Sequence, residues 1–158
     1  MGYNGPIIFE AELGIVIGKE CRNIDEDSAA DFIFGYTCVN DVSATGLLNK
    51  DFPGFQQWTR SKGYDSFCPL GPAIVTDLDT SELRIQGVLD GEKHQDYPVS
   101  DMVFKPHQIV AELSQIQTLM PGDLISCGTS LGVKPMEPGS KVDITVPGVG
   151  TLSNVFDV

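Results

Sequence analysis

A predicted β-hairpin at residues 83–98 is the sequence feature that most constrains the fold. In LRIQGVLDGEKHQDYP, two extended runs flank Asp90-Gly91, a dipeptide that favours a two-residue hairpin turn. Other short runs rich in β-branched and aromatic residues are bounded by turn-forming residues, as strands usually are. These runs cover residues 7–17, 34–42, 68–76 and 124–128, and two more surround a Pro-Gly turn within 141–158. The chain is therefore expected to consist mainly of β-strands.

Two short helices are expected among these strands. Apolar residues share one helix face within 106–116, at Ile109, Val110, Leu113 and Ile116. A second helix is expected to begin near Asp25, where acidic residues precede apolar ones. Residues 49–65 are rich in polar residues and glycine and are expected to form a long loop, which in a compact domain is usually functional. The expected fold class is mostly β or α+β, with residues 1–158 forming a single domain.

The charge of the chain argues against several classes of function. Its 158 residues include 22 acidic and 10 basic residues, which gives a net charge of -12. Nucleic-acid binding requires a basic face that displaces counterions, and docking on anionic membranes requires positive charge as well. No apolar run approaches the roughly 18 residues of a transmembrane helix, and the first residues lack the features of a signal peptide. A cytoplasmic protein is expected.

The four cysteines give no sign of a zinc or redox motif. They are scattered and form no C-x-x-C pair, at Cys21, Cys38, Cys68 and Cys127. Reduced thiols are the simplest expectation for a cytosolic protein, and a disulfide is left open.

Glu10 and Glu12 are the first candidate functional residues, because they lie in the otherwise apolar run IIFEAELGIVIG. Residues i and i+2 of a strand point to the same face, with Cα atoms about 6.6 Å apart. Two carboxylates so placed repel each other unless a cation lies between them, and Mg²⁺ and Mn²⁺ prefer such oxygen ligands. The alternative is a solvent-exposed strand face, of which the spacing by itself is more typical.

Three other segments carry candidate residues. Asp41 ends the segment GYTCVND within the strand-like run at 34–42, which is a typical position for a metal ligand and also for a turn residue. Arg60 and Lys62 lie beside aromatic residues in QQWTRSKGYD, a combination that suits an anionic organic ligand or an ordinary exposed loop. In SCGTSLG, glycines around Thr129 allow backbone N–H groups to approach a ligand oxygen, although a plain turn is the alternative.

Taken together, six segments resemble the fumarylacetoacetate hydrolase family. They are FEAELGIVIGK, GYTCVNDVSA, QWTRSKGYDSFCPLGP, DGEKHQDYPVSDMVF, LMPGDLISCGTSLGV and VPGVGTLSN, and they follow the family's order and spacing over nearly the whole chain. The resemblance implies a mixed β-roll with a divalent metal, usually Mg²⁺ or Mn²⁺. It also implies action on 2-oxo acids or β-diketo acids, such as acylpyruvates, fumarylpyruvate or oxaloacetate.

The resemblance also assigns roles to residues. Glu10 and Glu12 match the family's Glu-x-Glu metal ligands, and Asp41 matches the third carboxylate ligand. Lys62 matches a lysine that contacts substrate and steadies developing negative charge, and Thr129 matches a residue that binds a substrate carboxylate or oxo group.

Two further residues are expected to contact the substrate. Gly128 belongs to the same turn as Thr129, and Arg60 is expected to attract an anionic substrate. The implied chemistry is C–C bond cleavage, by hydrolysis or decarboxylation, through an enolate that the metal ion stabilises as a Lewis acid. Isomerisation or hydration of an unsaturated 2-oxo acid is the alternative activity.

Two departures from the family pattern bear on the reaction. Many members have Thr-Ala-Arg-Asp after the third ligand, whereas this chain has Ser43-Ala44-Thr45-Gly46 and lacks that substrate-binding arginine. The usual N-terminal lid, with a histidine and a glutamate that act on water, is expected to be missing, and neither His94 nor His107 matches the lid histidine. A non-catalytic metal- or ligand-binding homologue and a purely structural β domain therefore stay open. Family members are commonly dimers, so a homodimer is expected.

Overall fold

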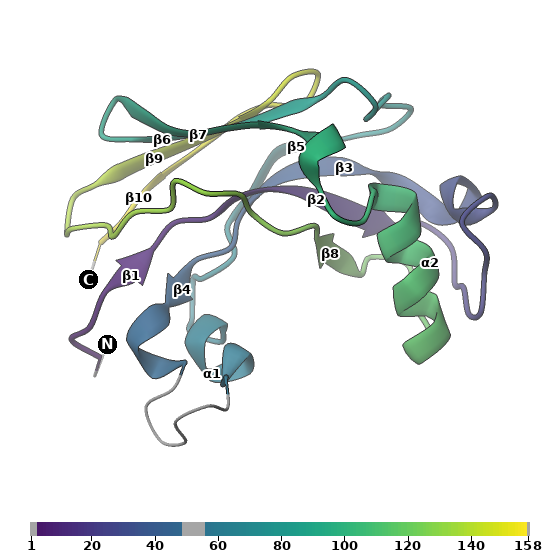
Figure 1. Cartoon of the computed structure of the whole chain (residues 1–158), viewed down its shortest axis with the longest axis horizontal. Helices are drawn as coiled ribbons and strands as arrows, with labels where there is room; N and C mark the ends of the chain where they lie inside the picture. Colours follow the sequence, from purple (N-terminus) through teal and green to yellow (C-terminus); the bar gives the residue numbers. More distant parts are fainter. Residues whose placement is uncertain (1–2, 49–55, 158) are drawn as a thin grey trace.

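Two four-stranded antiparallel sheets packed on each other form the body of the computed structural model, which describes residues 3–48 and 56–157 (Figure 1). The first sheet has the strand order β5 (Leu70–Val75), β3 (Ile33–Asn40), β2 (Ala11–Ile17), β8 (Leu124–Ser126). The second has the order β10 (Gly150–Val155), β9 (Lys141–Val146), β6 (Arg84–Leu89), β7 (Glu92–Pro98). A short pair, β1 (Ile7–Ile8) and β4 (Ser43–Ala44), extends from the first sheet. The predicted mostly-β fold class is confirmed.

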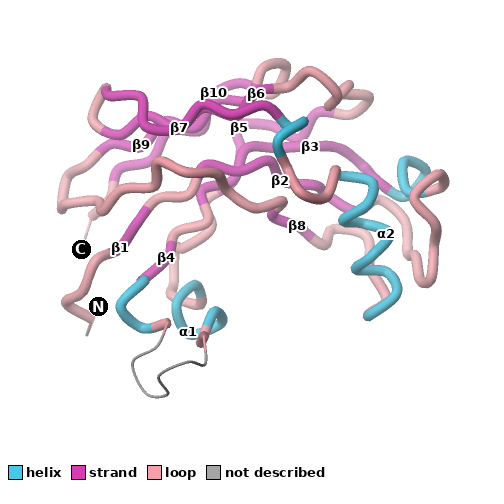
Figure 2. Tube along the Cα trace, in the orientation of Figure 1, coloured by secondary structure: helices cyan, strands magenta, loops and turns pink. Residues whose placement is uncertain are grey.

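Helices are short and lie at the margins of the two strand layers, as Figure 2 shows. The described residues contain α1 (Trp58–Lys62), α2 (Pro106–Ile116) and 3₁₀ turns at Ala29–Phe32, Thr45–Leu47 and Val99–Asp101. No helix within these residues is long and apolar enough to cross a membrane. All four cysteines are free thiols.

The predicted hairpin joins β6 to β7 through Asp90 and Gly91. Both residues have positive φ angles, 50° and 84°, as a type I′ turn requires. β6 also pairs with β9 on its other edge, so the hairpin forms half of the second sheet.

The core lies between the two sheets and is centred on β2. All seven residues of β2 are buried, because β3 and β8 flank it and the second sheet covers one of its faces. The largest fully buried side chains come from both layers and include Phe9, Leu13, Ile15, Ile85 and Ile144. The carboxylate of Glu12, which belongs to β2, therefore lies at the edge of the core and not on a solvent-exposed surface.

Two predicted elements differ from the structure. The strand expected over 7–17 is interrupted at Phe9 and Glu10, because Phe9 N–H donates to Lys134 O and Glu10 N–H donates to the side chain of Asn40. The helix expected from Asp25 is only the 3₁₀ turn at Ala29–Phe32.

The loop expected over 49–65 is wrong for residues 58–62, which form α1. The hydroxyl of Ser61 donates to Ala44 O and fixes this helix beside β4. Residues 49–55 lie outside the described residues. Helix α2 has the expected bounds 106–116, but Ile116 on its predicted apolar face is 76% exposed.

Candidate active site

Three carboxylates converge where β2 and β3 meet the β1–β4 pair. One oxygen from each of Glu10, Glu12 and Asp41 lies within 4.8 Å of the others. The antiparallel register that pairs Ala11 with Asn40 produces this arrangement, because it sets Glu10 opposite Asp41. A backbone hydrogen bond of 3.0 Å from Asp41 N–H to Glu10 O holds the two residues together.

Asn40 fixes the point at which the strand is interrupted. Its Oδ1 accepts a hydrogen bond of 3.1 Å from Glu10 N–H, and its side chain is buried. The break in the strand frees Glu10 from regular pairing, so that its side chain turns toward Glu12 and Asp41.

Glu12 is the most deeply buried of the three acids, with 2% exposure. Its Oε2 accepts hydrogen bonds from Ser126 Oγ and, at 2.8 Å, from Gly128 N–H. Burial raises the pKa of Glu12 to about 7, although these two donors oppose the rise. No hydrogen bond to Glu12 Oε1 occurs within residues 3–48 and 56–157, so this oxygen is available to a ligand.

Lys62 brings a positive charge to the cluster from α1. Its Nζ lies 2.9 Å from Glu10 Oε2 and also donates to Asp41 Oδ2. Burial disfavours the charged form, but the bonds to Asp41 and Glu10 outweigh it and raise the pKa of Lys62. For Glu10, burial raises the pKa, and this effect exceeds the lowering caused by the hydrogen bond from Lys62. The Trp58 ring, 5.4 Å from Nζ, covers one side of the ammonium group.

The turn at Gly128 and Thr129 lies against the segment that carries the two glutamates. Thr129 Oγ1 donates to Ala11 O at 3.1 Å and accepts from Gln95 Nε2 at 2.8 Å. Of the predicted residues, Lys62 and Gly128 contact the acids directly, and Thr129 contacts the backbone of Ala11 between the two glutamates. Arg60 is an exposed residue of α1, and it does not share a helix face with Lys62 because the two are two positions apart.

Sequence reasoning missed three residues of this site: Ser126, Gln95 and Tyr97. Gln95 and Tyr97 are buried on β7, where an amide and a phenol stand among apolar neighbours. A buried glutamine in a strand requires hydrogen-bond partners, but only the three-dimensional structure shows what they are.

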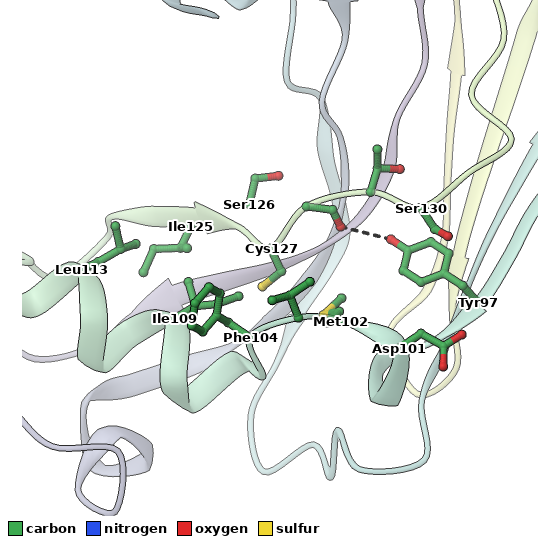
Figure 3. A pocket seen from close by; sticks show the side chains of 13 residues that line it. Tyr97, Asp101, Met102, Phe104, Ile109, Leu113, Ile125, Ser126, Cys127 and Ser130 are labelled. Carbon is green, nitrogen blue, oxygen red and sulfur yellow. Dashed lines mark hydrogen bonds between the residues drawn. The ribbon is translucent and has the colours of Figure 1, made fainter.

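An apolar cavity of about 510 Å³ lies beside the same turn. Figure 3 shows Ile125 and Cys127 together with Ile109 and Phe104, whereas the Ser126 side chain points away from them. Ser126, Gly128 and Thr129 also line this cavity, and the Ser126 hydroxyl bonds to Glu12, so the cavity borders the segment that contacts the acids.

The donor set fits a hard divalent cation. All three candidate ligands are carboxylates, and Mg²⁺ and Mn²⁺ are bound in proteins mainly through oxygen atoms. The ammonium group of Lys62 already lies against two of them, which shows that this position suits a positive charge.

Comparison with known proteins shows which family the chain resembles. The family model described as "Fumarylacetoacetate (FAA) hydrolase C-terminal" matches residues 3–157. Oxaloacetate tautomerase YisK of Bacillus subtilis is 37% identical over an alignment of 156 residues that covers 92% of this chain and 50% of that protein.

Solved structures give the same result. The 5-carboxymethyl-2-hydroxymuconate delta-isomerase from Mycobacterium smegmatis superimposes with a TM-score of 0.92 at 45% identity, covering 96% of this chain and 59% of that one. A maleylpyruvate hydrolase from Sphingobium sp. SYK-6, solved with manganese(II) and pyruvate, has a TM-score of 0.86 at 31% identity, with 96% and 55% covered. The chain thus spans 50 to 59% of the length of these three proteins. Because the family model covers almost every residue, this chain belongs to the fumarylacetoacetate hydrolase family.

Proposed function

We propose that this chain carries the metal-dependent active site of an enzyme that acts on a 2-oxo acid or β-diketo acid through an enolate. The observation that carries the proposal is the meeting of Glu10, Glu12 and Asp41 beside the ammonium group of Lys62. The reaction is C–C bond cleavage, by hydrolysis or decarboxylation, of a substrate such as an acylpyruvate, fumarylpyruvate or oxaloacetate.

Glu10, Glu12 and Asp41 would hold Mg²⁺ or Mn²⁺. When bound, such an ion supplies Lewis-acid stabilisation of the negative charge that develops on a substrate oxygen. Glu12 keeps one oxygen for this purpose because Ser126 and Gly128 bind the other.

Lys62 and Thr129 complete the site from two sides. Lys62 places a second positive charge next to the acids and stabilises the enolate that cleavage leaves behind. Thr129 and the backbone of Gly128 bind the carboxylate or oxo group of the substrate, and Arg60 on α1 draws the anion toward a protein of net charge -12. As the family resemblance implies, we expect a homodimer located in the cytoplasm.

A second candidate is isomerisation or tautomerisation of a 2-oxo acid at the same site. Hydrolysis needs a base that activates water. Within the described residues, His94 lies 3.8 Å from Glu92 and His107 is in α2, and neither has a hydrogen bond or ion pair with the three acids. A proton shift through the enolate requires no activated water, and the names of two of the relatives, a tautomerase and an isomerase, describe such a reaction.

One experiment tests the site and separates the reactions. Purified protein is treated with EDTA, reloaded with Mn²⁺ or Mg²⁺ and given oxaloacetate or an acylpyruvate, while enol absorbance and pyruvate are followed together. We expect metal-dependent turnover that Glu12→Gln abolishes and Glu92→Gln, at a carboxylate that is 79% exposed, leaves intact. Release of pyruvate identifies C–C cleavage, and loss of enol without pyruvate identifies tautomerisation. Undiminished turnover in EDTA, or no Mn²⁺ binding in calorimetry, would overturn the proposal.

A further inference from the structure

Ala11 lies between the two glutamates, opposite Asn40 of β3. On its other side, no strand of the described residues pairs with its backbone N–H and C=O groups. The backbone N–H and C=O groups of the odd-numbered residues of β2 point toward β8. The bonds from Cys127 N–H to Leu13 O and from Ile17 N–H to Asp123 O show this direction. The pairing of β2 with β8 covers only Gly14–Val16, so it ends before Ala11. Ala11 is fully buried, and its N–H and C=O therefore need other partners.

Two side chains of β7, in the opposite sheet, supply these partners. Gln95 Oε1 accepts a hydrogen bond of 3.0 Å from Ala11 N–H, and the Tyr97 hydroxyl donates to Ala11 O at 2.7 Å. Gln95 and Tyr97 are two positions apart in a strand and so point to the same face. Their exposures are 1% and 5%, so water cannot replace either contact.

The same two side chains also contact the turn at Gly128 and Thr129. Gln95 Nε2 donates to Thr129 Oγ1 at 2.8 Å and to Ser130 O at 2.9 Å. The Tyr97 hydroxyl lies 3.2 Å from Gly128 O, a contact drawn in Figure 3. β7 thus connects Ala11 to the turn through side chains alone.

We propose that Gln95 and Tyr97 are positioning residues that prepare the Thr129 hydroxyl to donate a hydrogen bond to the substrate, an inference that rests on the proposed function. Thr129 has one hydroxyl hydrogen, which it gives to Ala11 O at 3.1 Å. Tyr97 gives its hydrogen to the same oxygen over the shorter distance of 2.7 Å. When Thr129 turns its hydrogen toward a substrate oxygen, Ala11 O stays paired through Tyr97.

Gln95 performs the complementary task. Its amide nitrogen donates to Thr129 Oγ1, which holds the oxygen atom in place while the hydrogen rotates about the Cβ–Oγ1 bond. A donor on this oxygen also polarises the hydroxyl and strengthens the bond it makes to a ligand. Without Tyr97, the same rotation leaves the buried Ala11 O unpaired, so Thr129 is retained on Ala11.

A purely structural role makes a different prediction. Buried backbone groups are nearly always hydrogen-bonded, and loss of the Tyr97 hydroxyl then lowers only the stability of the fold. A positioning role also weakens binding of an oxyanion in protein that remains folded, and it requires Thr129 for that effect.

The test is Tyr97→Phe, which removes one oxygen and retains the packing, with Tyr36→Phe as the matched control. Tyr36 is a buried tyrosine of β3 that lies opposite Ile15, away from the acids. In wild type we measure Mn²⁺ affinity, then the affinity of the Mn²⁺-loaded protein for oxalate, a mimic of the pyruvate enolate. We expect Tyr97→Phe to weaken oxalate binding and raise KM by about three- to tenfold. The Mn²⁺ affinity of Tyr97→Phe should stay within twofold of wild type. For Tyr36→Phe, the Mn²⁺ affinity, the oxalate affinity and KM should all stay within twofold of wild type.

A double-mutant cycle tests whether Tyr97 affects oxalate binding through the hydroxyl of Thr129. In a Thr129→Val background, Tyr97→Phe is expected to have no further effect on oxalate affinity, because there is no hydroxyl left to release. Gln95→Glu replaces the donor to Thr129 with a carboxylate oxygen and gives the same loss by a second route if Tyr97→Phe does not fold. Unchanged oxalate affinity in the folded variants, or additive effects in the cycle, overturns this inference alone. Failure of wild type to bind Mn²⁺ or oxalate overturns the proposed function as well.

Discussion

The Nζ atom of Lys62 lies 2.9 Å from Oε2 of Glu10, on the side of the cluster that also contains Asp41. A positive side chain and a divalent ion would therefore bind the same two carboxylates. The lysine offsets the negative charge of the cluster, and a divalent ion at the same carboxylates would compete with it.

Replacing Lys62 is expected to separate metal binding from catalysis. Lys62→Met removes the competing charge, so Mn²⁺ affinity in calorimetry should increase about tenfold, while turnover is lost because the enolate loses its second cation. Lys93→Met, at an exposed lysine of β7, makes the same change of net charge and should leave Mn²⁺ affinity unchanged. Weaker Mn²⁺ binding by Lys62→Met would show that the lysine assists the ion.

The ionisation of Glu12 should make the metal-free protein less stable as the pH rises. The folded pKa of about 7 lies above the usual 4.5, so between these values the fold holds a proton that the unfolded chain has released. This contribution to stability is complete below pH 4.5 and is lost as the pH passes through 7, a change of about 3 kcal/mol. We expect chemical denaturation in EDTA to show it as a difference between wild type and Glu12→Gln, whose side chain does not ionise. A difference that does not vary with pH would show that Glu12 is ionised throughout.

Ser126 is expected to support metal binding through the same carboxylate. Its hydroxyl donates to Glu12 Oε2 and lowers the pKa of Glu12, so Ser126→Ala should raise that pKa above about 7. Mn²⁺ affinity should then fall about tenfold at pH 6.5 and recover at about pH 8.5, where Glu12 is ionised in both proteins. Ser153→Ala removes a similar bond to the partly exposed Asp143, far along the chain from the three acids, and should have no effect at either pH. An equal loss at both pH values would indicate a change of geometry instead.

Gly87 of β6 lies against Phe9 and Ala11, with no room for a side chain. A Cβ atom at this position would lie 2.9 Å from Phe9 Cε2, 3.0 Å from Ala11 Cβ and 3.2 Å from Gln95 Oε1. Gly87→Ala should therefore lower the free energy of unfolding by about 1–3 kcal/mol and weaken Mn²⁺ binding, because Ala11 moves with the strand. Denaturation and calorimetry on the same preparation measure both effects. A variant as stable as wild type would show that the sheets can separate without cost.

Features that depend on local sequence were predictable. The turn at Asp90-Gly91 follows from two residues that tolerate positive φ, and α2 follows from its apolar spacing and a proline in its first turn. Helix α1 has only five residues and depends on the contact from Ser61 to Ala44, so its own sequence does not specify it.

The site was predictable only in part, for a related reason. The spacing of Glu10 and Glu12 was by itself more typical of an exposed strand, and family resemblance rather than spacing assigned Asp41 as the third ligand. The register of β2 with β3 brings Glu10 and Glu12 next to Asp41, and this register depends on contacts between distant parts of the sequence. Gln95 lies 84 positions from Ala11, and no periodicity relates the two residues.

The full burial of β2 has a consequence for how the site behaves over time. Glu12 lies in a strand from the middle of the first sheet, and such segments exchange their amide hydrogens only in rare, large-scale openings of a protein. Fraying of the chain near its ends therefore leaves Glu12 in place. An ion held there would depart by stepwise substitution of its ligands within an intact molecule, at a rate independent of local melting.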